Sequence, residues 1–276
     1  PRPVLKDIAG EVHKQLDSSG VGAQIRPGAS IALTGGSRGI ANIALILKEA
    51  AAYVKAKGGN PFIIPAMGSH GGAVAEGQTE ILASLGITES YCGCPIRSSM
   101  ETDLIGITEV SQIPVYEDHY AHQADGVILV NRIKPHPSFS GNVESGVCKM
   151  AAVGLGKQKG AAAYHRLGIG NMSKTVQEVA CYLFEHGNII GGIGTVENAY
   201  DETALIEAMT TEHILEREAE LLKIAYENFP QIYFKKYDVL LVEEMGKNIS
   251  GAGMDTMIIS RYTHDGIPND KRQQNG

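Results

Sequence analysis

Apolar residues follow two alternating patterns along this chain: short uninterrupted runs, and longer segments in which they recur every three or four positions. The first pattern predicts buried strands and the second predicts helices. The expected strands are 29–34, 61–66, 124–132, 188–198 and 237–246, and the expected helices are 5–16, 42–57, 76–86, 173–186 and 211–228. This alternation indicates an α/β fold with a mostly parallel sheet, in which 29–65 is the clearest βαβ unit.

Glycine and small apolar residues share the segment 147–168, where we expect a helix, a turn and a second helix. A later helix ends near Pro230, and we place a domain boundary after residue 236. Residues 1–236 are then expected to form one N-terminal domain. Residues 237–276 are expected to begin a second α/β domain that is truncated.

Composition narrows the class of protein. The chain has 276 residues, a formal net charge of −7 and no basic tail, which argues against non-specific nucleic-acid binding. No apolar run approaches the roughly 20 residues of a membrane-spanning helix, and the N-terminus lacks a signal-peptide pattern. We therefore expect a cytoplasmic protein with no nucleic-acid or membrane partner. Four cysteines are too few for a disulfide framework.

Polar loops follow three of the expected strands: "GGSRGIA" (35–41), "MGSHGG" (67–72) and "NRIKPHPSFSG" (131–141). Parallel α/β sheets bind ligands outside the carboxyl ends of their strands, where such loops meet. A fourth loop, "MGKNISGAGMD" (245–255), follows the last expected strand. The sequence therefore predicts a ligand site built from these loops.

The first loop is similar to the T-G-x-x-x-G-I-G turn of short-chain dehydrogenases, except that Ala41 replaces the last glycine. The Tyr-x-x-x-Lys pair of those enzymes occurs only as Tyr53 and Lys57, inside the helix that follows the turn. No acidic residue closes the second strand to hold a ribose. We therefore expect a different ligand.

The glycine turn still suits an anion. Backbone N–H groups of Gly36, Ser37 and Gly39, at the entrance to a helix, can bind a phosphate or a carboxylate. Arg38 adds a planar fork of donors that matches a carboxylate.

Two histidines, His70 and His136, occupy neighbouring strand-end loops, and the ordinary pKa of histidine suits proton transfer near neutrality. Lys149 stands in an otherwise small and apolar stretch. Its amine is either a nucleophile or covalent tether with a lowered pKa, or it reaches the surface or pairs with Glu144. Near Lys157 and Lys159 the spacing fails as a nucleotide-binding loop, so these lysines are only candidates for meeting a phosphate.

Several long motifs together resemble the lactate racemase family, which uses a nickel-pincer nucleotide. They are "PAMGSHGGAVAEGQ", "NRIKPHPSFSG", "ESGVCKMAAVGLGKQKGAAAYH" and "GKNISGAGMD", and the similarity extends over roughly residues 1–261. The resemblance implies the N-terminal domain of a 2-hydroxy acid racemase or epimerase. It also implies a small hydroxy-acid substrate, and cofactor-synthesis enzymes as partners.

The same resemblance implies residue roles. The cofactor, a pyridinium-3,5-bisthiocarboxylic acid mononucleotide, would be covalently linked to Lys149, and His165 would be the nickel ligand at the spacing of the family motif. His70 and His136 would act as alternating base and acid, and Arg38 would hold the substrate carboxylate. The fourth loop departs from the family pattern, so Lys247 is only a substitute for the second substrate-binding cation.

Two other functions stay open at this point. One is a zinc-dependent hydrolase with His70, His136 and His165 as ligands, because zinc sites favour three protein ligands and a water. The other is an anion-binding module without catalysis, built on Arg38 and the glycine turn. A homo-oligomer is possible under each.

Overall fold

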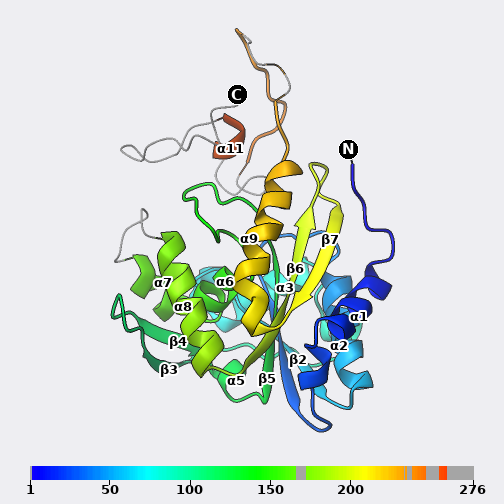
Figure 1. Ribbon diagram of the computed structural model, residues 1–276, viewed down its shortest axis with the longest axis vertical. Helices are drawn as coiled ribbons and strands as arrows, with labels where there is room; N and C mark the ends of the chain where they lie inside the picture. The colour runs from blue at the N-terminus through cyan, green and yellow to red at the C-terminus, as the bar shows by residue number, and fades with distance from the viewer. Residues whose placement is uncertain (1, 166–171, 233, 235–237, 247–254, 260–276) are drawn as a thin grey trace.

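A five-stranded sheet forms the centre of the computed structural model, which describes residues 2–165, 172–232, 234, 238–246 and 255–259 (Figure 1). Its strand order is β2-β1-β5-β6-β7, and all pairs are parallel except β6–β7. The strands are β1 (Ser30–Gly35), β2 (Asn60–Pro65), β5 (Gly126–Arg132), β6 (Ile189–Glu197) and β7 (Thr203–Met209). The fold is therefore the mostly parallel α/β architecture that the sequence predicts.

Helices connect the strands and cover both faces of the sheet. The α-helices are α1 (Ile8–Ser18), α2 (Ile43–Ala56), α3 (Ala75–Ser84), α4 (Glu89–Cys92), α5 (His119–His122), α6 (Val147–Lys149), α7 (Lys157–His165), α8 (Met172–His186), α9 (Thr211–Glu227) and α11 (Thr256–Ile259). Tighter or wider turns are the 3₁₀ segments η1 (Gly22–Gln24) and η2 (Gly71–Ala73) and the π-helical segment η3 (Met150–Gly154). The predicted helices are confirmed with small shifts at their ends.

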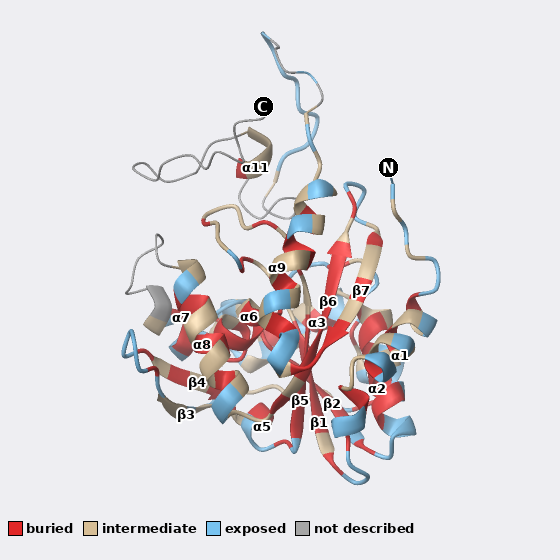
Figure 2. Cartoon of the chain, in the orientation of Figure 1, coloured by how far each residue is buried: buried red, intermediate tan, exposed pale blue. Residues whose placement is uncertain are grey.

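Alternate residues of β1 pack into two different hydrophobic clusters, as expected for a strand whose side chains point to opposite faces. Ile31 and Leu33 belong to a cluster with buried residues of α1 and α2, and Ala32 belongs to a cluster with buried residues of α6, α8 and α9. Figure 2 shows buried residues running along the strands, with exposed residues on the outer sides of the helices. The sheet thus lies between two helical layers.

Two strand pairings were not expected from the sequence. A separate antiparallel hairpin joins β3 (Thr102–Ile107) to β4 (Pro114–Asp118). At the edge of the main sheet, β7 pairs with β6 in the antiparallel direction. Both β3 and β7 are only half-buried along much of their length, so they lack the uninterrupted apolar run of a central strand.

The predicted strand 237–246 is wrong for the part that the structure describes. Residues 238–246 form neither strand nor helix, and Val239 and Leu241 are exposed. An apolar run forms a strand only where neighbouring backbone pairs with it. The domain boundary after residue 236 stays a prediction. Within the described ranges, none of the helices has the length and apolar content needed to cross a bilayer.

Candidate active site

A cleft of about 810 Å³ opens at the carboxyl ends of the parallel strands. The chain leaves β1 toward β2 on one side, and the β5–β6 connection lies on the other side, so β1 and β5 flank the point where the sheet order reverses. Crevices form at such points because the loops diverge. Seven of the nine site residues predicted from the sequence line this cleft: Gly36, Ser37, Arg38, Gly39, His70, His136 and Lys149.

The glycine turn contributes one wall of the cleft. Arg38 is exposed there, and a Cβ atom added at Gly39 would meet nothing within 4 Å, which leaves open space beside the backbone. The helix entrance is arranged differently from our expectation. The N–H of Ala41 donates to Glu197 Oε1 (2.7 Å), so a carboxylate of this chain already lies at that end of α2. The backbone left open beside the cleft is therefore that of the turn itself.

His70 reaches the cleft from the loop after β2. Gly68, Gly71 and Gly72 all have positive φ angles near it, a conformation that glycine adopts without steric cost. The Nδ1 atom of His70 forms a hydrogen bond with Ser37 Oγ. The loop after β1 and the loop after β2 are thus joined side chain to side chain.

His136 is held in place by a hydrogen bond of its backbone, by a hydrogen bond of its ring and by one stacked aromatic ring. Its N–H donates to Glu144 Oε2 (2.7 Å), and its Nδ1 accepts from the N–H of Ser138 (3.1 Å). The ring stacks on Phe139, with centroids 4.0 Å apart. Burial lowers the pKa of His136 to about 2, and the charges of Lys149 and Lys134 add to the effect. Without a ligand, this histidine is neutral.

Lys149 ends α6, and η3 continues the helix directly after it. Its ammonium lies 5.7 Å from the centroid of the Phe139 ring. Burial lowers the pKa of Lys149 to about 8, helped by the charges of Lys134 and Arg38. None of the ion pairs between described residues includes it. A neutral amine, which is the nucleophilic form, is therefore accessible near neutrality.

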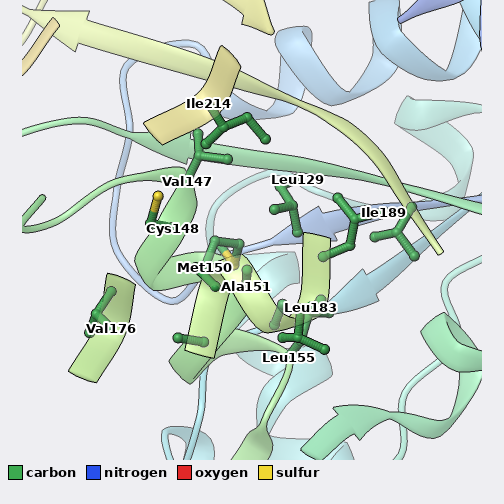
Figure 3. Close-up of a cluster of buried hydrophobic side chains, with 14 of the residues drawn as sticks. Leu129, Val147, Cys148, Met150, Ala151, Leu155, Val176, Leu183, Ile189 and Ile214 are labelled. Atoms are coloured by element: carbon green, nitrogen blue, oxygen red, sulfur yellow. The ribbon is translucent and has the colours of Figure 1, made fainter. Parts of the chain in front are cut away.

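The helix that carries Lys149 packs against apolar side chains and is hydrogen-bonded to one buried carboxyl group. Figure 3 shows Val147, Cys148 and Met150 in the cluster that also contains Ile214 of α9. Glu218, also on α9, accepts a hydrogen bond from the N–H of Cys148 (2.8 Å). Burial raises the pKa of Glu218 to about 7. This carboxyl group caps a helix start that has no side-chain cap of its own.

Sequence reasoning missed several polar residues of the cleft. Arg132 and Glu197 form an ion pair at the ends of β5 and β6, and Lys134 lines the same wall. The backbone of Lys134 is fixed by paired hydrogen bonds with Ser145 (2.9 and 3.3 Å). Burial lowers the pKa of Lys134, as does the charge of Arg132. The signal was available, because "NRIK" (131–134) lies at the end of an expected strand.

Two predicted residues cannot be placed. The side chain of His165 and all of Lys247 lie outside the described residues, so their roles as nickel ligand and substrate cation stay predictions. Among the side chains that the structure describes, no group of three His, Cys, Asp or Glu residues is arranged to hold a metal ion.

Lys157 is not near the cleft surface, contrary to its candidacy for a phosphate. It is buried and pairs with Asp118 at 3.0 Å. Asp118 is buried as well. The ion pair between β4 and α7 accounts for the burial of Lys157 and Asp118, since burial is tolerable for charges that are paired.

One of three comparisons with known proteins finds a structure of similar architecture. No family model matches the chain, and no curated protein does. The solved structure of the lactate racemase apoprotein from Thermoanaerobacterium thermosaccharolyticum is similar, with a TM-score of 0.57 and 14% sequence identity. The match covers 80% of this chain and 56% of that chain, so this chain spans little more than half of its length. The protein therefore shares its α/β fold with a lactate racemase.

Proposed function

We propose that this chain is a racemase or epimerase of a 2-hydroxy acid that works with a nickel-pincer nucleotide linked to Lys149. The observation that carries the proposal is the convergence of Lys149, His70, His136 and Arg38 in one cleft, from four separate segments. The fold shared with a lactate racemase supports the same reaction class. Fold alone does not fix function, so the argument depends on the site.

The residues of the cleft fit such a group. A pKa of about 8 gives Lys149 the neutral amine that an amide or thioamide link requires. The volume of about 810 Å³ is in the range of cofactor pockets, and Gly39 leaves room for close approach of a phosphate. His165 would be the nickel ligand. When bound, the cofactor would supply a centre that takes a hydride from the substrate carbon and returns it.

This chain's own residues would bind the substrate and move its hydroxyl proton. Arg38 would hold the carboxylate with its two parallel N–H groups. His70 and His136 would exchange the hydroxyl proton, one as acceptor and the other as donor. Because Ser138 donates to Nδ1 of His136, the neutral ring carries its hydrogen on Nε2, and this N–H can donate a hydrogen bond to a substrate oxygen.

Linkage at Lys149 would also change the acid–base behaviour of the cleft. An amide carries no charge, so one of the two cations that lower the pKa of His136 would be removed. Burial, the largest cause of the low pKa, would remain.

The decisive experiment is mass spectrometry of the chain co-produced with the cofactor-synthesis enzymes. The expected result is an intact-mass increase of a sulfur-containing nucleotide, mapped to the peptide with Lys149 and absent from Lys149→Arg. Lys159→Arg, an exposed lysine outside the cleft lining, should still be loaded. Active protein with an unmodified Lys149 would refute the proposal, and bound zinc without the nucleotide would favour the hydrolase.

An anion-binding module without catalysis is the second candidate. It is favoured by the three cations Arg38, Lys134 and Lys149, which share the cleft. The charge of Arg38 contributes to the lowered pKa of both lysines. This function needs no histidine chemistry. His70→Ala should then bind a hydroxy acid as the parent does, and Arg38→Ala should not.

A further inference from the structure

The buried lysine of α7 has a full set of partners. The side chain of Lys157 is 1% exposed, and its ammonium carries three N–H donors. It donates to the carbonyl oxygen of Pro65 and to Gln78 Oε1 (3.1 Å), and it pairs with Asp118 at 3.0 Å. Burying a charge is costly unless such partners are present. The three partners together therefore allow the ammonium of Lys157 to be buried.

Gln78 passes this contact on to the loop that carries His70. Its side chain is fully buried, and its Oε1 faces Lys157. Its Nε2 donates to two backbone carbonyl groups, those of Gly68 (3.0 Å) and His70 (3.1 Å). Together with Lys157 at Pro65, the two side chains therefore hold the loop at its start, its middle and its catalytic residue.

Asp118, the partner of Lys157 on the side away from Gln78, is held in a different part of the fold. Asp118 is buried, and its Oδ1 accepts from the N–H of Ala121 (3.0 Å), which fixes the carboxylate at the start of α5. The loop needs this support, because the positive φ angles of Gly68, Gly71 and Gly72 belong to residues with large backbone freedom.

We propose that Gln78 and Lys157 are positioning residues that set the location of His70 from behind the cleft. The inference rests on the proposed role of His70 in proton transfer. Neither residue touches the space that a substrate would occupy, and neither lines the cleft. Their contribution is geometric, and a misplacement of about 1 Å can cost on the order of 100-fold in rate.

Gln78→Glu removes the two donors of this side chain and keeps its acceptor for Lys157. A carboxylate at this position keeps an oxygen for the ammonium of Lys157, so the buried charge stays paired. It has no N–H to donate to the carbonyls of Gly68 and His70, so the loop loses two restraints. We expect kcat of the loaded enzyme to fall roughly 10- to 100-fold, with KM changed less than about threefold because Arg38 is untouched.

Gln112→Glu is the matched control. Gln112 Nε2 also donates to two backbone carbonyls, those of Thr108 (3.3 Å) and Glu109 (2.9 Å), in the turn between β3 and β4. The same loss of two donors there should leave kcat and KM unchanged. Gln78→Met, an apolar side chain of similar length, is the second variant should Gln78→Glu fail to fold.

A measurement that needs no turnover completes the test. The ¹⁵N chemical shifts of the His70 imidazole report its hydrogen bonding in the cofactor-free chain, and His136 gives an internal reference. We expect the His70 shifts to move in Gln78→Glu and in Gln78→Met but not in Gln112→Glu, with the His136 shifts unchanged. Unchanged His70 shifts in a folded Gln78 variant would overturn the inference. This arm gives an answer even if the chain proves to have no racemase activity.

Discussion

The amide of Ser138 donates a hydrogen bond to Nδ1 of His136, at 3.1 Å. The contact fixes which nitrogen of the neutral ring carries the proton, while the stacked ring of Phe139 fixes its plane. The two cations next to it, Lys149 and Lys134, oppose protonation. The state of His136 is therefore set by neighbours whose charge can be changed one at a time.

Removal of the charge at Lys149 should raise the pKa of His136. Lys149→Met deletes the larger of the two charge effects that lower this pKa from its ordinary value to about 2. Burial remains, so we expect a value above 2 but still below 6.5, measured by NMR titration of the His136 ring protons. Lys159→Met should leave the titration as it is in the parent. An identical His136 titration in Lys149→Met would show that its charge does not reach the ring.

Lys149 should react faster with acylating reagents than the exposed lysine side chains of the cofactor-free chain. A pKa lowered to about 8 leaves a substantial neutral fraction at pH 7.5, whereas exposed lysines are almost fully protonated there. Brief treatment with a small acylating reagent and peptide mass spectrometry should find Lys149 modified before Lys48 or Lys14. The rate should rise with pH and level off above about pH 8. A rate still climbing steeply at pH 10 would contradict the lowered pKa.

Glu218 should make stability fall as the pH rises. Burial raises its pKa from 4.5 to about 7, so the folded chain binds the proton more tightly than the unfolded chain does. Its contribution is complete below about pH 4.5 and is lost as the pH approaches 7, by at most roughly 3 kcal/mol. Glu218→Gln keeps an acceptor for Cys148 and should remove this slope, measured by urea unfolding between pH 5 and 8. A parallel pH dependence in both proteins would argue against a protonated Glu218.

Two glycines of the cleft should respond differently to alanine. A Cβ atom at Gly154 would lie 2.8 Å from the backbone oxygen of Ala66, so Gly154→Ala should cost about 1–3 kcal/mol of unfolding free energy. Gly39→Ala meets nothing within 4 Å and should leave stability within about 0.5 kcal/mol. If the turn approaches a phosphate as proposed, Gly39→Ala should nevertheless reduce cofactor loading at Lys149. Normal loading in that variant would place the phosphate elsewhere.

Strong apolar patterns were sufficient to predict the centre of the fold. The runs that became β1, β2, β5 and β6 are buried on both faces, which is what an uninterrupted apolar run indicates. The edge strand β7 has half-buried positions between its buried ones, so it lacks the uninterrupted apolar run of a central strand. The run at 238–246 has the composition of a strand, but no described strand pairs with it, and pairing is not written in a local pattern.

The site residues also fall into those that could be predicted from the sequence and those that could not. His70, His136, Arg38 and Lys149 could be named because they are unusual residues at the ends of buried strands or within a small apolar segment. The place of Lys157 could not be, since it depends on a carboxylate in the hairpin that the sequence did not reveal. Long-range pairing of charges has no periodicity to detect.

The direction in which the Lys149 amine points depends on the number of residues in the π-helical segment Met150–Gly154, which follows it directly. Each residue of an α-helix advances the chain by about 100° around the axis, and a π-turn holds one residue more than an α-turn. Deleting Ala151 or Ala152 would restore regular winding and rotate Lys149 by about 100° relative to the residues after the deletion. A one-codon deletion that alters no side chain of the cleft would then aim the amine away from it.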